Sequence, residues 1–134
     1  MRQHRDSDSD RVQLTSYIMD MLDDWGVGNT AKLNLLALSD CPKRVVRRYY
    51  LGEPLPDKVE VNERIGHLQG IADALYTSYP LNAQMAAFWL NQKNHRFSDQ
   101  TPMNFMLEGG LKNMVLVRVH LDCAWDWHQS GSTL

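Results

Sequence analysis

Apolar residues recur at intervals of three and four along most of the chain, which is the period of an amphipathic α-helix. The pattern is clearest in one stretch, where the spacing alternates between four and three: Val61, Ile65, Leu68, Ala72, Leu75 and Tyr79. It predicts a helix of about five turns that ends at Pro80. No segment shows the pattern of a β-strand, and no repeat of solenoid length is present. The sequence therefore predicts an all-α fold.

The first half of the chain predicts three shorter helices. Glycine and proline set their expected limits: a helix over residues 11–25 stopped by Gly26, a second capped by Asn29 or Thr30, and a third that begins at Pro42 and ends at Gly52. Asp40 or Cys41 would have to cap the third helix. Three short helices with a tight break before the third are typical of a helix-turn-helix module. In this register Val46 and Tyr49 pack inward.

The charge of the chain is unevenly distributed. Between Cys41 and Gly52 lie four basic residues and no acidic one, so the rest of the chain carries −6 against a net charge of −2. A basic element on an acidic body is expected of a small DNA-contacting element, and a solvated helix face is the alternative. The candidate DNA-binding residues are Lys43, Arg44, Arg47 and Arg48.

The second half predicts further short helices around a polar loop. Asn82 can cap the first, Phe97 is the one apolar residue of the loop, and Thr101–Pro102 starts the next helix. Gly109–Gly110 ends that helix, and a last amphipathic helix runs from Leu111 to about Trp127. Gly66 and Gly70 interrupt the long helix at up to about 1 kcal/mol each. Either another helix approaches closely there, or tertiary packing carries the helix regardless.

No motif for catalysis or metal binding is present. The histidines and cysteines lack ligand spacing, although a zinc site assembled from distant residues stays open. No nucleophile stands out beside a base, so we expect a non-enzymatic protein without cofactor or metal. Cys41 and Cys123 stand alone, which favours reduced thiols over a disulfide. Without a membrane-length apolar run or a secretory signal, the chain is expected to be cytoplasmic.

The order of residues in the last third resembles the toxin-binding domain of the Xre/MbcA/ParS family of antitoxins. The shared features are a Trp-Leu helix end, an Asn before a Phe loop, a Pro helix start and a Gly-Gly-Leu break: Trp89–Leu90, Asn91, Asn94, Phe97, Thr101–Pro102, Met106, Gly109–Gly110–Leu111 and Arg118. The resemblance is strong over residues 61–122 and moderate over residues 11–60, where LLALSDCPKRVVRRYYLGE is similar to the second and third helices of Xre-like regulators. Ser98 stands where the family has glycine, and Met103 follows the proline.

The resemblance implies an antitoxin of a type II toxin–antitoxin system. Such a protein would bind over the active site of a RES/ParT-type, ADP-ribosyltransferase-like toxin that uses NAD, and would repress its own operon as a homodimer. The implied organisation is a disordered lead-in (1–10), a helix-turn-helix subdomain (11–60), a connecting helix with the toxin-binding domain (61–128) and a flexible tail (129–134).

Clustering around the loop, the Gly-Gly break and the exit of the last helix selects the expected toxin contacts: Arg96, Phe97, Glu108, Gly109, Gly110, Arg118, Asp122 and Trp127. Trp125 can belong to the core while Trp127 is exposed, or both tryptophans can cover the core. Two rival functions remain. One is a stand-alone helix-turn-helix regulator whose C-terminal half mediates dimerisation, and the other is a helical adaptor whose basic stripe is an ordinary solvated face.

Overall fold

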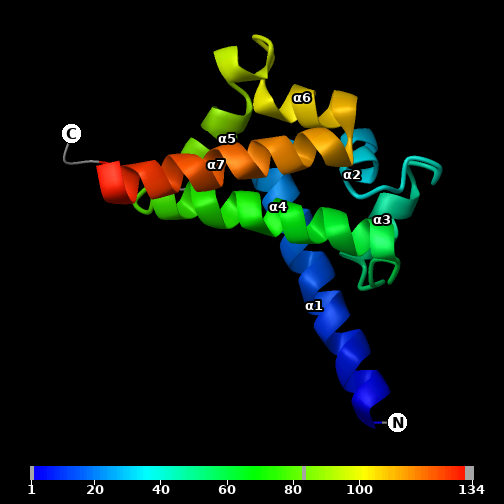
Figure 1. Cartoon of the computed structure of the whole chain (residues 1–134). Helices are drawn as coiled ribbons and strands as arrows, with labels where there is room; N and C mark the ends of the chain where they lie inside the picture. Colours follow the sequence, from blue (N-terminus) through cyan, green and yellow to red (C-terminus); the bar gives the residue numbers. More distant parts are fainter. Residues whose placement is uncertain (1, 83, 132–134) are drawn as a thin grey trace. The chain divides into compact units, whose positions relative to one another are not determined.

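A computed structural model describes the backbone of residues 2–82 and 84–131, and the side chains of residues 9–82 and 84–123. Over these residues the chain is helical, without a β-strand (Figure 1), so the all-α prediction is confirmed. The elements are α1 (Arg2–Asp24), α2 (Asn29–Leu35), α3 (Val45–Tyr50), α4 (Val59–Ser78), α5 (Gln84–Leu90), the 3₁₀-helix η1 (His95–Phe97), α6 (Pro102–Gly109) and α7 (Leu111–Gly131). No helix in the described part is both long and apolar enough to cross a membrane.

The chain divides into two compact units, Met1–Glu63 and Arg64–Leu134. The boundary therefore lies within α4, whereas the sequence placed it between residues 60 and 61, at the start of the long helix. We refer to these as the N-terminal unit and the C-terminal unit.

In the N-terminal unit, α1 and the residue that follows it supply large buried side chains. Ile18, Met19 and Leu22 of α1, and Trp25 directly after the helix, are each at most 1% exposed. α1 packs against α3, whose Val46 is 1% exposed. The backbone of α1 is helical from Arg2, where the sequence predicted a disordered lead-in over residues 1–10.

The starts of α2 and α3 differ from the prediction. Gly28, in extended conformation, is the N-cap of α2 and makes no side-chain cap, so neither Asn29 nor Thr30 caps this helix. α3 begins at Val45 rather than Pro42, because residues 42–44 form a turn in which the Val45 N–H donates to the Pro42 carbonyl at 2.9 Å. Arg44 occupies the N-cap without a side-chain bond, so the expected caps at Asp40 and Cys41 are absent.

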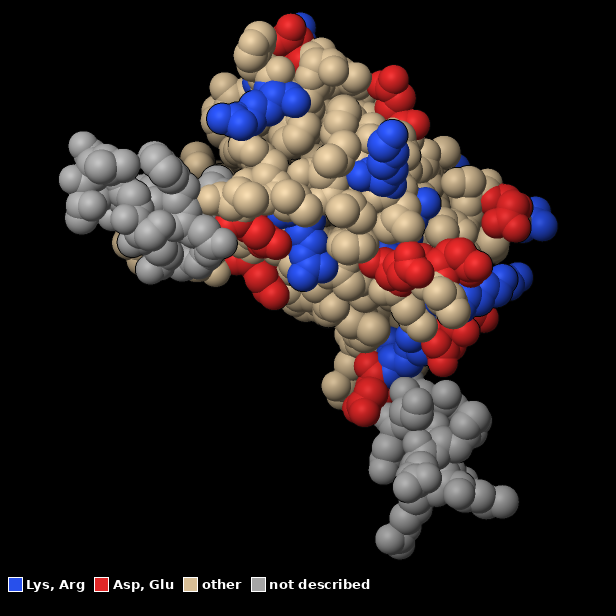
Figure 2. Space-filling view, viewed as in Figure 1, with Lys and Arg blue, Asp and Glu red and all other residues tan. Residues whose placement is uncertain are grey.

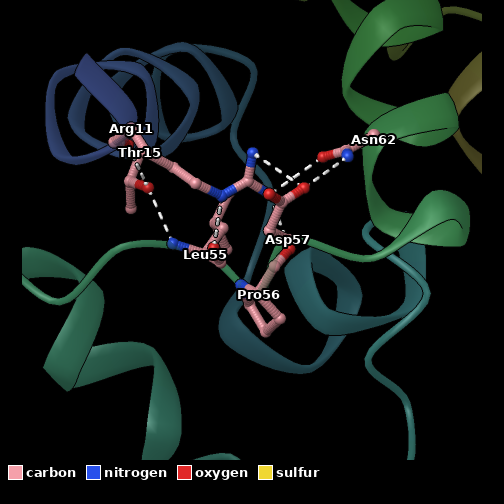
Figure 3. Close-up of polar contacts among 6 residues, drawn as sticks. All are labelled: Arg11, Thr15, Leu55, Pro56, Asp57 and Asn62. Atoms are coloured by element: carbon pink, nitrogen blue, oxygen red, sulfur yellow. Dashed lines mark hydrogen bonds and ion pairs between the residues drawn. The ribbon is translucent and has the colours of Figure 1, made fainter. Parts of the chain in front are cut away.

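The segment between α3 and α4 is held against α1 by Arg11 (Figure 3). Its guanidinium donates to the carbonyls of Leu55 at 2.6 Å and Pro56 at 2.5 Å and to the Asn62 side chain at 2.9 Å. One turn further along α1, the Thr15 hydroxyl accepts from the Leu55 N–H at 2.9 Å. Buried backbone groups need partners, so these contacts satisfy a segment that lacks regular structure of its own.

In the C-terminal unit, α4 and α7 lie side by side and run in the same direction (Figure 1). The pairing of Arg64 with Gly110 and of Gly70 with Arg118 gives the same direction. α5 and α6 pack together, and α6 packs along α7. The predicted five-turn helix is confirmed as the 20 residues of α4.

Most helix starts of this unit follow the prediction. The Asn82 side chain accepts from the Gln84 N–H at 3.1 Å, and the Thr101 hydroxyl accepts from the Asn104 N–H at 3.0 Å, with Pro102 as the first residue of α6. Gly110 ends α6 with a φ of 68°, a conformation that glycine adopts without strain. α7 continues to Gly131, beyond the expected end near Trp127 and into the predicted tail.

Candidate recognition surfaces

The basic residues of α3 and the turn before it face solvent. Lys43, Arg44, Arg47 and Arg48 are exposed, while Val46 and Tyr49 are buried at 1% and 5%, as the predicted register requires. Three of the four basic side chains line one hollow beside α3; Arg48 does not belong to its lining.

A buried lysine connects the three helices of the N-terminal unit. Lys32 of α2 is 3% exposed, and its Nζ lies 2.6 Å from Oδ1 of Asp23 at the end of α1. The Tyr50 hydroxyl, at the end of α3, donates to Oδ2 of the same carboxylate at 2.7 Å, and the Lys32 Nζ lies 5.7 Å from the Tyr50 ring centroid. A lysine is rarely buried unless it is paired, and this one joins α1, α2 and α3.

The pKa values of this group reflect the pairing. Burial alone would raise the pKa of Asp23, but the hydrogen bonds from Lys32 and Tyr50 outweigh it and the pKa is lowered. Burial likewise works to lower the pKa of Lys32, and the hydrogen bond to Asp23 reverses the direction. Sequence reasoning missed Lys32, although it falls on the same helical face as Leu35 and Leu36, an unusual place for an unpaired charge.

In the C-terminal unit, two predicted partner contacts lie together. The Arg118 guanidinium lies across Gly70, where a Cβ atom would overlap it, and its Nε is 3.8 Å from Oδ2 of Asp122. Its Nη1 is 3.4 Å from the Gly66 carbonyl and 3.2 Å from Nδ1 of His67. The close approach expected at the glycines of α4 is therefore made at Gly70, by a side chain of α7. A Cβ on Gly66 would meet nothing within 4 Å.

A shallow hollow opens beside this arginine. Its lining combines one cation, two carboxylates and small side chains from α4 and α7: Gly70, Asp73, Ala74, Thr77, Arg118 and Asp122. Asp73 and Thr77 were not among the predicted contacts. Asp73 follows Gly70 by three residues and Thr77 follows Asp73 by four, a spacing that would have placed them on the face of α4 that carries the glycine.

The predicted contact Phe97 is buried rather than exposed. Its side chain is 4% exposed and packs among three other rings, with centroids 5.1 Å away at Phe105, 5.5 Å at His120 and 6.2 Å at Trp89. An aromatic ring that is the one apolar group of a loop gains most by entering the core. Phe97 therefore anchors the loop to α5, α6 and α7.

A backbone bridge closes the polar loop, and two neighbouring residues within it have positive φ values. Asn94 and Gln100 form an isolated antiparallel bridge, and the Asn94 side chain accepts from the Arg96 N–H at 3.0 Å. Ser98 and Asp99 have φ values of 58° and 61°. Ser98 thus adopts the left-handed conformation at the position where the resemblance led us to expect glycine.

His120 of α7 forms part of the same aromatic cluster. Its ring stacks on Trp89, with centroids 6.2 Å apart and planes 13° apart. Burial lowers the pKa of His120, and the positive charge of Arg96 adds to the effect. The imidazole is thereby favoured in its neutral form.

The remaining predicted partner contacts are spread along the unit. Arg96 is exposed in η1, and Glu108 and Gly109 are exposed at the end of α6. Gly110 is half-buried, and Gly109 is crowded by the Asn113 side chain, whose amide donates to the Phe105 carbonyl at 2.9 Å. The Trp125 and Trp127 side chains lie outside the described residues. Leu116 and Val119 of α7 are 46% and 50% exposed and were not predicted as contacts.

The described side chains offer binding groups but no gathered metal ligands. No three His, Cys, Asp or Glu residues among them could hold a metal ion, and both cysteines are free thiols. Lys and Arg are scattered among Asp and Glu on the face drawn in Figure 2. No family model matches the sequence, and neither the curated proteins nor the solved structures contain a significant match.

Proposed function

We propose that this protein is an antitoxin. Its C-terminal unit would bind over the active site of an ADP-ribosyltransferase-like, NAD-using toxin, and its N-terminal unit would bind the promoter of its own operon as a homodimer. The proposal rests first on the order of motifs from Trp89 to Arg118, which resembles the Xre/MbcA/ParS family. It assigns the protein a function in recognition rather than in catalysis.

The surface of the C-terminal unit supports the partner-binding half of the proposal. Arg118 is held at 37% side-chain exposure beside Asp122, so its position is defined before a partner arrives. Interface energy concentrates in arginine and aromatic residues, and a pre-positioned side chain loses less conformational entropy on binding. Arg118 is therefore the single residue on which we place the largest share of toxin binding.

Co-purification with the neighbouring toxin tests this half. Arg118→Ala and a chain ending after Ala124 should each weaken capture of a tagged, catalytically inactive toxin by at least tenfold, which corresponds to about 1.4 kcal/mol. Lys112→Ala is the matched control, because it removes an exposed cation from the same helix without touching the Arg118 hollow. Wild-type capture by both altered chains would refute the assignment.

Gly70→Ala offers a second test that leaves every charged side chain in place. The new methyl group would overlap the Arg118 guanidinium and force it to move. Toxin affinity should fall, while the helix loses a glycine and gains up to about 1 kcal/mol of propensity. A chain that is equally or more stable but binds less toxin would show that the position of Arg118, rather than folding, carries the affinity.

The exposed basic residues beside the Lys32 pair support the DNA-binding half. Each phosphate that a protein neutralises adds about 0.9 to the salt dependence of duplex binding. Replacing Arg44 and Arg47 with alanine should lower affinity for the upstream promoter and flatten that dependence. Unchanged promoter binding would refute a role for α3.

A stand-alone regulator is the second candidate, and one observation favours it. Leu116 and Val119 are exposed on α7, as they would be on a helix that pairs with another copy of the chain. The two functions differ in the neighbouring gene and in the partner. A toxin pulled down from cells with the wild-type chain would decide for the antitoxin, and self-association lost on Leu116→Asp with no toxin captured would decide for the regulator.

A further inference from the structure

A hollow in the N-terminal unit brings the cations of α3 and of the turn before it together with a residue of α2. It is lined by one residue of α2, two of the turn before α3 and three of α3: Asn29, Lys43, Arg44, Val46, Arg47 and Tyr50. Three of the lining side chains are positively charged and none is acidic. The hollow therefore carries a local charge of about +3 at neutral pH, although the chain as a whole is acidic.

The neutral residues of the hollow are held in place by contacts outside it. Val46 is 1% exposed, so it belongs to the core and closes the hollow on one side. The Tyr50 hydroxyl donates to Asp23, which fixes its ring as a wall. The side-chain oxygen Oδ1 of Asn29 accepts from Nζ of Lys32 at 3.3 Å. The Asn29 side chain can therefore offer its amide N–H₂ group as a donor in the hollow. Val46 and Tyr50 are thus held in place as walls, and the three cations, like Asn29 and Tyr50, are exposed.

We propose that this hollow binds one phosphate group. Guanidinium groups match phosphate oxygens through paired N–H donors, and a lysine adds a compact positive charge. Three cations around a single phosphate group together neutralise its charge, whereas one surface lysine or arginine leaves the phosphate largely hydrated. The shared chemistry is the phosphate itself, which a DNA backbone or free phosphate could supply. The choice of DNA as the source of the phosphate rests on the proposed operator binding. The binding of a phosphate group by the hollow does not depend on that proposal.

Arg48 separates this proposal from simple attraction to a basic stripe. It follows Arg47 directly and is also exposed, yet it does not line the hollow. Successive residues of a helix point about 100° apart, so two neighbouring arginines reach different surfaces. Arg47→Gln and Arg48→Gln remove the same charge from the same short helix and form a matched pair.

The first experiment uses inorganic phosphate and the full-length chain at constant ionic strength. Phosphate should shift the amide NMR signals of Asn29, Arg47 and Tyr50 saturably, whereas chloride should not. Arg44→Gln with Arg47→Gln should abolish the saturable shift, and Arg48→Gln should retain it. Circular dichroism of each variant establishes that it is folded. Equal loss in Arg47→Gln and Arg48→Gln, or no saturable shift in the wild-type chain, would overturn the hollow as a phosphate site.

The second experiment measures promoter duplex binding at several salt concentrations. Because Arg44 and Arg47 would share one phosphate, the double variant should lower the salt slope by no more than about 0.9, the contribution of one phosphate contact, rather than by twice that amount. A decrease of about 1.8 in the double variant would mean separate phosphates and overturn the proposal. Phosphate binding without duplex binding would support the hollow as a phosphate site and refute operator binding. Duplex binding without phosphate binding would support operator binding and refute the hollow as a phosphate site.

Discussion

The two units of this protein hold their helices together by different means. In the N-terminal unit, charged and polar side chains join the elements: Arg11 binds the segment before α4, and Lys32 joins Asp23 and Tyr50. In the C-terminal unit, the polar loop is joined to the helices around it by the rings of Trp89, Phe97, Phe105 and His120, and Arg118 of α7 lies at the surface.

The difference bears on what each unit can offer a partner. Ion pairs and hydrogen bonds fix direction as well as distance, and in the N-terminal unit they join α3, which carries exposed cations, to α1 and α2. An aromatic cluster supplies apolar area without fixed hydrogen-bond directions. At the surface of the C-terminal unit, Arg118 and Asp122 pair with each other. The predictions below test this contrast, from the largest expected effect to the smallest.

Phe97→Ala should destabilise the C-terminal unit most. Removing a buried phenylalanine costs about 3–5 kcal/mol, through lost burial and the cavity left behind. Denaturant unfolding followed by tryptophan fluorescence would measure the loss. Phe88→Ala is the control, because that ring is 56% exposed and its removal should cost no more than about 0.5 kcal/mol. Equal losses in the two variants would show that the loop is not anchored by Phe97.

Lys32→Ala should destabilise the N-terminal unit by about 2 kcal/mol, less than the 3–5 kcal/mol for breaking a fully buried pair, because the Asp23 side chain is 46% exposed. Amide hydrogen exchange should become faster in α3, because Tyr50 is bonded to the Asp23 carboxylate and the substitution removes the lysine that pairs with this carboxylate. Lys58→Ala, at an exposed lysine, serves as the control. Exchange in α3 that stays at the wild-type rate would show that the ion pair does not position this helix.

The same pair gives a direction for the pH dependence of the N-terminal unit. The pKa of Asp23 is lowered in the folded state, so its contribution is complete above the unfolded value near 3.8 and is lost as the pH falls through the folded value. The raised pKa of Lys32 makes its contribution complete below about 10.5 and lost as the pH rises through the folded value. Asp23→Asn should weaken both dependences, as urea unfolding at several pH values would measure.

Ser98→Gly should stabilise the C-terminal unit by about 1 kcal/mol, because a left-handed conformation costs a residue with a Cβ about that much. Thermal unfolding would measure the gain. Ser78→Gly, at the end of α4, is the matched control and should not stabilise, since its backbone is helical. Destabilisation by Ser98→Gly would mean that its hydroxyl contributes more than the backbone strain costs.

His120 should make the C-terminal unit slightly less stable in mild acid. Its folded pKa is lowered by burial and by Arg96, so the neutral ring contributes fully above the unfolded value of about 6.5. The contribution is lost progressively as the pH falls from that value toward the folded pKa, because the unfolded chain binds the proton more readily. His120→Gln should remove this dependence, while His95→Gln, at an exposed histidine, should retain it.

Much of the fold could be predicted because it depends on local rules. The four-and-three spacing gave α4 nearly its observed limits, and Thr101–Pro102 with Gly109–Gly110 bounded α6. Prediction was weaker at helix starts, where several neighbouring polar residues could each have served as the N-cap. At α2 and α3 the expected caps were replaced by Gly28 and by a turn over residues 42–44, because several polar residues could have served and only tertiary packing chooses among them.

The candidate recognition residues likewise divide into those that local rules could place and those that only tertiary packing could place. The exposure of Arg47 and Arg48 follows from the helix period once Val46 and Tyr49 turn inward, whereas Lys43 and Arg44 are exposed in the turn before α3. Phe97 could not be assigned in this way, since a lone aromatic in a polar loop can equally contact a partner or anchor the loop. Its burial depends on α5, α6 and α7 meeting around it.

The sequence by itself determined the helical character of the chain, the position of α4 and the local concentration of positive charge, because periodicity, glycine, proline and charge act over a few residues. Tertiary structure alone decided that Lys32 is buried against Asp23, that Arg118 lies across Gly70 and that Arg47 faces a hollow which Arg48 does not reach. Each of these depends on distances between helices remote in sequence, and the burial and partners that such distances create have no signature in the local pattern.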